Sequence, residues 1–277
     1  MNRLLLCTDL DRTLIPNGSQ PESPGAREIF SRLVDTEGVK LAYVSGRHRA
    51  LIEQAIDEYQ LPLPDFAIAD VGSTIYQAGD GAWKKWQAWS DEIAGEWQGH
   101  SSEVLHSLLS DITVLQLQEK EKQNRHKLSY YLPLGENHQP VMAEIERRLQ
   151  ARQFRANLIW SVDEAKSIGL LDILPASANK RHAIEFLMQQ SGYDGKQTIF
   201  AGDSGNDLDV LLSPIQAVLV GNADSEVRNA ALQAADQQNI YLACGGFLSM
   251  NGYYSSGILE GIAHYRPEFV PLIESMQ

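Results

Sequence analysis

Cysteine is scarce in this 277-residue sequence, which contains only Cys7 and Cys244. Two cysteines are too few for a disulfide framework or a thiolate metal site. Basic residues are also in deficit, because 23 lysines and arginines face 36 acidic residues and leave a net charge of −13. No basic stripe offsets this balance, so the sequence argues against a nucleic-acid or anionic-membrane partner.

Long apolar runs are missing as well. No run approaches the length needed to span a membrane, and the apolar run near the N-terminus is too short for a signal peptide. We therefore expect a soluble, cytoplasmic protein, and a monomer. A hydrophobic content of 43% and a charged content of 21% are ordinary for a globular chain of this size. Such a chain accommodates a core plus a smaller second domain.

Short apolar runs alternate with amphipathic runs over residues 1–79 and again over residues 175–277. Runs such as LLLCTDL lack a helical period and predict buried strands, whereas RALIEQAIDEY predicts a helix. Ser23 followed by Pro24 predicts the N-cap and first position of another helix. Strands that alternate with helices imply right-handed βαβ units on a parallel sheet. We expect one α/β core built from both segments.

Residues 80–174 follow a different pattern and predict an inserted domain. STIYQAGDGAWKKW predicts a hairpin that turns through AGDG. A compact α+β module with an antiparallel sheet is expected beyond it, and its four tryptophans are expected to pack in its core. The predicted strand, helix and two further strands cover residues 128–133, 140–153, 156–162 and 168–175.

Two aspartates, Asp9 and Asp11, follow the first predicted strand. Residues two apart in a strand point to the same face, so both carboxylates can face one point beyond the carboxyl edge of the sheet. Open α/β sheets bind ligands at that edge. From this segment alone, a turn in which aspartate caps backbone groups explains the pair equally well.

A second acidic cluster favours a site. FAGDSGND ends another buried strand with Asp203 and then turns to Asn206 and Asp207. Two acidic loops at the carboxyl ends of parallel strands converge, and several carboxylates around one point suit Mg²⁺ with its waters and a phosphate.

Groups that bind phosphate also follow predicted strands. Ser45 and Gly46 in YVSGRH place a hydroxyl and exposed amides at a strand-to-helix turn, which can form an anion nest. Lys180 opens a helix, where the helix dipole disfavours a cation, and this suggests a nearby anion. Each signal is weak alone, because Ser-Gly turns and surface lysines are common.

Taken together, four segments resemble the haloacid dehalogenase (HAD) superfamily of aspartate-nucleophile phosphatases. They are DLDRT (Asp9 to Thr13), SGR (Ser45 to Arg47), Lys180 and GDSGND (Gly202 to Asp207), and they occur in the family's order. The resemblance implies a Rossmann-like parallel-sheet core over 1–79 and 175–277. Its insertion, 80–174, resembles the C2 cap domain of the Cof-type (HAD-IIB) group.

Within that group the sequence is most similar to sucrose-phosphate phosphatases, through VGSTIY, KLSYYL, LDILP and SSGILEGIAHY. The resemblance implies a phosphatase that acts on a phosphorylated sugar or glycoside such as sucrose 6-phosphate. Arg12 and the segment SVDEAKSIGL depart from the pattern. Phosphatases of glucosylglycerol phosphate or mannosylfructose phosphate therefore fit as well. A phosphosugar-binding partner domain of a glycosyltransferase is a further alternative, and association with the cognate glycosyltransferase stays open.

The resemblance also assigns roles to residues of the core. Asp9 becomes the nucleophile that forms an aspartyl-phosphate, and Asp11 becomes the general acid and base. Mg²⁺ is the implied cofactor. Its implied ligands are the carboxylate of Asp9, the backbone carbonyl of Asp11, the carboxylate of Asp203, and Asp207 directly or through water. The implied phosphate-binding residues are Thr13, Ser45, Gly46, Lys180 and Asn206, and Lys180 is implied as a catalytic residue as well.

Sugar recognition is expected mainly from the cap. Lys127, Ser129 and Tyr131 alternate along one predicted strand and share a face that can hydrogen-bond sugar hydroxyls. Arg47 of SGR is grouped with them as a substrate contact. The alternative is that this face of the sheet is simply solvated.

Overall fold

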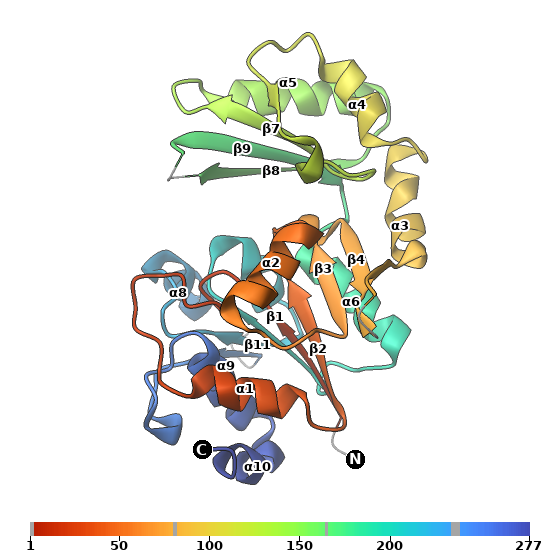
Figure 1. Cartoon of the computed structure of the whole chain (residues 1–277). Coiled ribbons are helices and arrows are strands. Elements are labelled where there is room, and N and C mark those ends of the chain that lie inside the picture. Colours follow the sequence, from red (N-terminus) through yellow and green to blue (C-terminus); the bar gives the residue numbers. More distant parts are fainter. Residues whose placement is uncertain (1–2, 80–81, 164–165, 234–238) are drawn as a thin grey trace.

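Two β-sheets organise the chain in the computed structural model, which describes residues 3–79, 82–163, 166–233 and 239–277. Figure 1 shows the larger sheet with helices on both faces and the smaller sheet above it, with two helices on the side away from the core. The larger sheet has the strand order β12-β11-β10-β1-β2-β3-β4-β5, and the smaller has β6-β7-β9-β8. This mixed α/β architecture confirms the predicted fold class.

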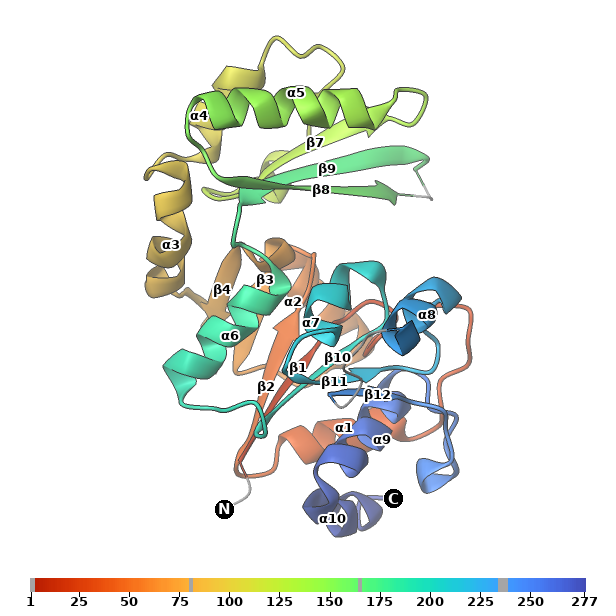
Figure 2. The same ribbon diagram turned by 180° about the vertical axis from the view of Figure 1, so that it is seen from behind.

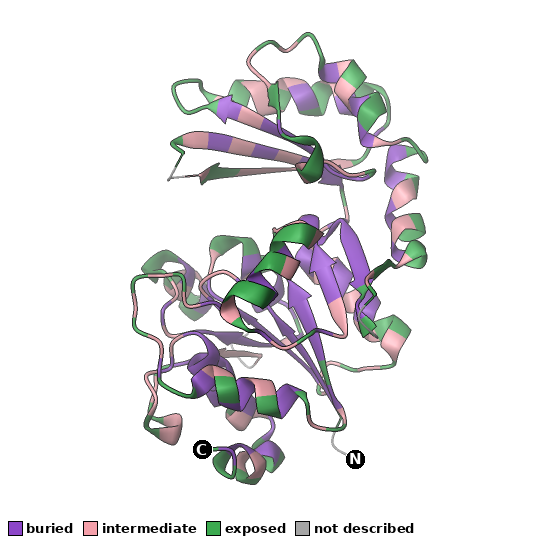
Figure 3. Cartoon of the chain, viewed as in Figure 1, coloured by how far each residue is buried: buried purple, intermediate pink, exposed green. Residues whose placement is uncertain are grey.

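The strands of the larger sheet are short and mostly buried, as the apolar runs predicted (Figure 3). In chain order they are β1 (Leu4–Thr8), β2 (Val39–Val44), β3 (Phe66–Ala69), β4 (Thr74–Gln77), β5 (Lys84–Lys85), β10 (Thr198–Gly202), β11 (Gln216–Leu219) and β12 (Ile240–Leu242). Strands β12 to β3 pair in parallel, and β4 and β5 add an antiparallel edge.

Helices cover both faces of this sheet, as the two opposite views in Figures 1 and 2 show. On one face lie α1 (Ala26–Val34), α2 (Arg49–Tyr59), α9 (Ser255–Tyr265) and α10 (Val270–Glu274). On the other lie α3 (Gln87–Ala94), α6 (Lys180–Ser191), α7 (Leu208–Leu211) and α8 (Ser225–Gln233). The prediction omitted α10.

The register of β1 with its neighbours places the site. Thr8 pairs with Ala201 of β10 and with Tyr43 of β2. These three parallel strands therefore end level with one another. The residues that follow them along the chain emerge at the same carboxyl edge of the sheet, which is where open α/β sheets bind ligands.

The smaller sheet carries two helices on one face. Its elements are α4 (Ser102–Leu109), β6 (Gln116–Leu117), β7 (Leu128–Pro133), α5 (His138–Ala151), β8 (Ala156–Asp163) and β9 (Ile168–Pro175). Strand, helix, strand, strand appears as predicted, and all its strand pairings are antiparallel. The prediction missed α4 and β6.

The segment between the two sheets packs on the core. The hairpin β4–β5 forms as predicted, although residues 80 and 81 of its turn lie outside the described residues. Trp89 and Ile93 of α3 pack against the larger sheet, whereas Trp97 packs in the cap. Packing of all four tryptophans in the cap core was therefore a wrong expectation. The division at residue 79 stays a prediction, and we propose that the cap begins near residue 95.

Glu96 forms hydrogen bonds that link the segment leading into the cap with the segment leading out of it. Its carboxylate accepts hydrogen bonds from the Ser177 backbone N–H at 2.8 Å and from the Arg155 guanidinium at 2.5 Å. Its backbone carbonyl accepts from the Arg155 N–H at 2.9 Å. The Glu96 side chain therefore links the two ends of the cap.

One helix start differs from its prediction. The N-cap of α1 is Gly25, with φ 76°, and Ser23 does not cap the helix. The Ser23 hydroxyl instead accepts a hydrogen bond from the Asn251 backbone N–H at 3.0 Å. A tertiary contact has replaced the local capping that Ser-Pro favours.

Candidate active site

Asp9 and Asp203 meet at the carboxyl edge because β1 and β10 are adjacent and parallel. Both are buried, with 5% and 1% of their surface exposed. Asp207 is also fully buried, and one carboxylate oxygen from each of the three lies within 4.8 Å of the others. The structure thus brings together the two acidic segments predicted to converge.

Lys180 supplies the balancing positive charge. Its Nζ donates to Asp9 Oδ1 and to Asp207 Oδ1, both at 2.7 Å, and to Asn206 Oδ1 at 3.2 Å. Burial opposes the ammonium charge of Lys180, but the charges of Asp207 and Asp9 outweigh it and raise the pKa. Lys180 is therefore a buried cation held by two carboxylates, as its place at the start of α6 suggested.

Asp203 is left with excess negative charge. Thr13, fully buried, donates its hydroxyl to Asp203 Oδ1 at 3.1 Å. Asp203 Oδ2 has no hydrogen-bond partner among the described residues, and the Arg12 Nε lies 3.4 Å from it. Burial and then the charge of Asp207 raise the pKa of Asp203 to about 7.

Asp207 is occupied by the loop that carries it. Its Oδ2 accepts from the backbone N–H groups of Asp203 and Ser204, both at 3.2 Å, and from the Ser204 hydroxyl at 3.1 Å. Together with the Ser204 side chain this forms a capping box at the 3-10 helix Gly205–Asp207. Asn206 is exposed, and its Oδ1 accepts from Ser204 as well as from Lys180.

Asp11 lies apart from the three-carboxylate cluster. Arg47 holds its carboxylate with Nε at 2.8 Å and Nη2 at 2.6 Å, and Asn17 Nδ2 donates to Oδ1 at 2.7 Å. Burial alone would raise the pKa of Asp11, but the hydrogen bonds and charge of Arg47 outweigh it and lower the pKa. Arg47 therefore contacts Asp11 from the core loop after β2, and does not belong to the cap.

The serine turn after β2 forms as expected. Ser45 is 1% exposed and its hydroxyl accepts a hydrogen bond from the Arg47 N–H at 3.1 Å. Gly46 is exposed beside it. The turn follows the strand adjacent to β1, so it opens at the same edge as Asp9.

In the cap, the three predicted residues form hydrogen bonds and ion pairs with neighbouring cap residues. Lys127 and Ser129 are buried, and both contact Asp172, which pairs with Ser129 across β7 and β9. The Tyr131 hydroxyl donates to Glu119 and accepts from Lys122 at 2.7 Å. This strand face is hydrogen-bonded within the cap, not solvated.

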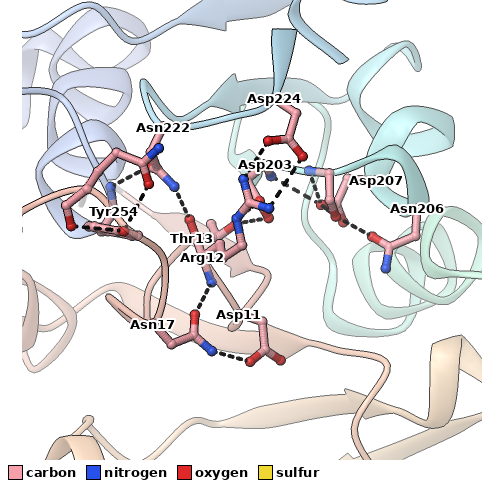
Figure 4. A network of polar contacts seen from close by, with 12 residues as sticks. Asp11, Arg12, Thr13, Asn17, Asp203, Asn206, Asp207, Asn222, Asp224 and Tyr254 are labelled. Atoms are coloured by element: carbon pink, nitrogen blue, oxygen red, sulfur yellow. Dashed lines mark hydrogen bonds and ion pairs between the residues drawn. The ribbon is translucent and has the colours of Figure 1, made fainter. Parts of the chain in front are cut away.

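Several residues of the site were missed by the sequence analysis. Figure 4 shows Arg12 between Asp203 and Asp224, with Asn17 linking Arg12 to Asp11. Arg12 Nη2 lies 2.8 Å from Asp224 Oδ1. Asn222, 4% exposed, contacts the same loop from the end of β11. Its position in GNAD, shortly after the buried strand β11, was the available signal.

The donor set fits a hard cation. Three buried carboxylates converge, one of their oxygens, Asp203 Oδ2, lacks a hydrogen bond within the described part of the chain, and Lys180 alone does not neutralise them. Oxygen ligands of this kind suit a divalent metal ion.

Comparison with known proteins assigns this arrangement. The model of the family described as sucrose-6F-phosphate phosphohydrolase matches residues 2–266. The chain belongs to this family. It is accordingly a phosphatase of the HAD type, as the four sequence segments had implied. No helix in the part of the chain described by the structure is long and apolar enough to cross a membrane.

Relatives of known name support the assignment. A putative HAD-like hydrolase from Nitrosococcus oceani is 57% identical over 96% of this chain, which spans 72% of that protein. Sucrose-phosphatase 1 from Nicotiana tabacum is 27% identical over 95% of the chain, which spans only 59% of its length. Mannosylfructose-phosphate phosphatase from Agrobacterium fabrum is 28% identical, with 94% of this chain and 96% of that protein covered.

A solved structure is similar throughout. The sucrose-phosphatase of Synechocystis sp. PCC6803, in complex with sucrose and phosphate, superposes with a TM-score of 0.73. The two chains are 26% identical, and the match covers 96% of this chain and 98% of the other. The similarity extends over the core and the cap.

Proposed function

We propose that this chain is a Mg²⁺-dependent phosphatase that hydrolyses a sugar or glycoside phosphate, such as sucrose 6-phosphate, through an aspartyl-phosphate. The observation that carries the proposal is the buried cluster of Asp9, Asp203 and Asp207 around Lys180 at the carboxyl edge of the sheet. Such a cluster is costly for folding, because buried like charges repel. A catalytic use explains why it is there.

In the first half of the reaction, Asp9 attacks phosphorus and forms a bond between its carboxylate oxygen and the phosphoryl group. The bond from phosphorus to the sugar oxygen breaks, and Asp11 gives that oxygen a proton. In the second half, Asp11 takes a proton from water, which attacks the aspartyl-phosphate and releases inorganic phosphate. Proton donation requires Asp11 to separate from Arg47, which holds it in the anionic form.

The transferring phosphoryl group needs donors around it. Thr13, Ser45 and Lys180 are buried; the two hydroxyl groups follow β1 and β2 at the same edge, and the ammonium group of Lys180, at the start of α6, contacts Asp9. Donors fixed before the reaction stabilise developing charge without reorganisation. The exposed Gly46 amide and Asn206 complete this set at the solvent side.

Mg²⁺ would be held by the carboxylates of Asp9 and Asp203 and by the Asp11 carbonyl, with Asp207 oriented behind them. Because Asp207 Oδ2 is occupied by backbone amides, its role is to fix the loop that carries Asp203. When bound, the ion offsets the repulsion between an anionic nucleophile and an anionic phosphate.

Recognition of the sugar is assigned to the cap face of Lys127, Ser129 and Tyr131. Lys127 Nζ lies 3.5 Å from Asp172, too far for a good hydrogen bond, so a sugar hydroxyl can replace this contact. Mannosylfructose phosphate is the alternative substrate, favoured by the near-complete mutual coverage with the Agrobacterium phosphatase.

The test is phosphate release from sucrose 6-phosphate, mannosylfructose phosphate, glucosylglycerol phosphate and p-nitrophenyl phosphate, with Mg²⁺ and with EDTA. Turnover that persists in EDTA, or in an Asp9→Asn variant, rejects the mechanism. Lys127→Ala should raise KM for the preferred sugar phosphate far more than for p-nitrophenyl phosphate. Lys120→Ala, at an exposed cap position, is the matched control. Equal effects of Lys127→Ala on both substrates reject the sugar-binding role.

A further inference from the structure

Arg12 has an unusual backbone for its residue type. Its φ is 59°, in the left-handed region that L-residues other than glycine and asparagine rarely adopt. It lies between Asp11 and Thr13, so its conformation decides where both of these residues point. Backbone strain of this kind persists only where neighbouring groups fix it.

Two asparagine side chains fix the two peptide groups of Arg12. Asn17 Oδ1 accepts from the Arg12 backbone N–H at 2.8 Å, and Asn222 Nδ2 donates to the Arg12 carbonyl at 2.6 Å. The other end of the Asn17 amide donates to Asp11 Oδ1 at 2.7 Å. Arg12 is thus held from both sides, and one of the two arms also holds the predicted proton donor (Figure 4).

Asn222 is anchored away from this loop. Its Oδ1 accepts from the backbone N–H of Tyr254 at 2.9 Å, and Tyr254 itself has a positive φ of 52°. Tyr254 is fully buried at the start of α9. Asn222, which is 4% exposed, therefore connects the loop after β1 to a buried part of the core.

The hydrogen bonds of Asn17 and Asn222 to Arg12 also affect the positions of the reacting groups. The Arg12 carbonyl belongs to the peptide that carries the Thr13 N–H, and the Thr13 hydroxyl contacts Asp203. The Arg12 side chain contacts Asp203 as well. If Arg12 relaxes to a right-handed conformation, Asp11 and Thr13 both move relative to Asp9, and small displacements of reacting groups are costly for rate.

We propose that Asn222 is a positioning residue of the reaction, which holds Arg12 in its left-handed conformation and thereby sets the positions of Asp11 and Thr13. This inference rests on the proposed phosphatase function. It predicts that Asn222→Ala lowers kcat by about 10- to 100-fold while KM changes much less. Asn222→Asp keeps the acceptor for Tyr254 but loses the donor to Arg12, so it should show most of the same loss.

The decisive readout is rescue by glycine at position 12. Glycine adopts a positive φ without steric cost. In an Arg12→Gly background, the loss of the Asn222 hydrogen bond should therefore have a smaller effect on kcat and on stability. A double-mutant cycle over Arg12→Gly and Asn222→Ala, measured in kcat and in urea midpoint, should show coupling in both. A merely structural asparagine would give additive effects and no rescue.

Asn251 provides a matched control. Its Nδ2 donates to the Pro21 carbonyl at 2.8 Å, and its Oδ1 accepts from the Tyr253 N–H at 3.0 Å and the Ser256 hydroxyl at 3.1 Å, so Asn251→Ala removes at least as many hydrogen bonds elsewhere. We expect Asn251→Ala to keep kcat. Equal losses of kcat in the Asn222 and Asn251 variants, or no coupling with Arg12→Gly, overturn the inference. A wild-type chain that hydrolyses no phosphate ester refutes the proposed function, and the urea cycle then still decides whether Asn222 holds Arg12.

Discussion

Replacement of Asp203 by asparagine should inactivate the protein and at the same time stabilise its metal-free form. Asp203 is 1% exposed, and burial together with the charge of Asp207 raises its pKa from 3.8 to about 7. Because each pKa unit corresponds to about 1.4 kcal/mol, ionised Asp203 destabilises the fold by about 4 kcal/mol. An asparagine side chain at this position would carry no charge and would still accept the Thr13 hydrogen bond.

The sign of this effect depends on pH. The pKa in the folded state exceeds that in the unfolded state, so the penalty is absent below pH 4, grows between pH 4 and 7, and is complete above 7. In EDTA at pH 8, Asp203→Asn should therefore be more stable than the wild type by about 2–4 kcal/mol, less the lost contact with Arg12. At pH 4 the difference should disappear.

Urea unfolding in EDTA at pH 8, 6 and 4 measures this difference. Addition of Mg²⁺ should stabilise the wild type and leave the variant unchanged, because ligand binding to the folded state adds stability. Asp224→Asn is the control, since it removes the other, 60% exposed carboxylate beside Arg12 and should change stability by less than about 1 kcal/mol. A variant that is less stable than wild type at pH 8, or a pH-independent difference, refutes the reasoning.

Three further predictions concern buried groups outside Asp203. Burial lowers the pKa of His126 to about 4. As the pH falls from 6.5 to 4, the free energy of unfolding of the wild type should therefore decrease by up to about 3 kcal/mol more than that of His126→Gln. Urea unfolding at both pH values measures this difference. Lys180→Met leaves buried carboxylates unpaired and should destabilise the metal-free protein by about 3–5 kcal/mol in the same assay; a loss below about 1 kcal/mol would contradict the buried pairing. Gly72→Ala should lower the melting temperature far more than Gly25→Ala. Both glycines have positive φ, but only a Cβ at position 72 would clash, at 2.4 Å from the backbone carbonyl carbon of Asn179. Equal shifts in melting temperature would disprove the clash.

Parts of the fold governed by local pattern were predictable. The bounds of α2, β7 and β9 match the predicted segments, because their apolar patterns are uninterrupted. The meeting of Asp9 with Asp203 was also predictable, since it needs only that two strands be parallel neighbours. The order and direction of the strands are enough to predict that these two residues meet, and the conformations of their side chains are not needed for this prediction.

Contacts that depend on loop conformation were not predictable. The contact of Arg47 with Asp11 was not foreseen, and Arg12 was unassigned but lies between Asp203 and Asp224. The role of Arg47 as a substrate contact stays a prediction. The contacts of Arg47 and Arg12 both depend on the relative positions of two loops that follow different strands. Neither secondary-structure propensity nor hydrophobic periodicity predicts these positions. The prediction that Ser23 caps α1 was wrong for a related reason, because the backbone N–H of Asn251, more than two hundred residues away, donates to the Ser23 hydroxyl.

The hydrogen bonds of Glu96 have a consequence for how the molecule can be engineered. Because the Glu96 carboxylate reaches the Ser177 backbone N–H at 2.8 Å, we expect that a short linker between these two positions can replace the cap while the core is kept. We propose the same two positions for the insertion of a different cap. The larger sheet, the acidic cluster and Lys180 all lie outside the exchanged segment, so such an exchange would leave these groups in place.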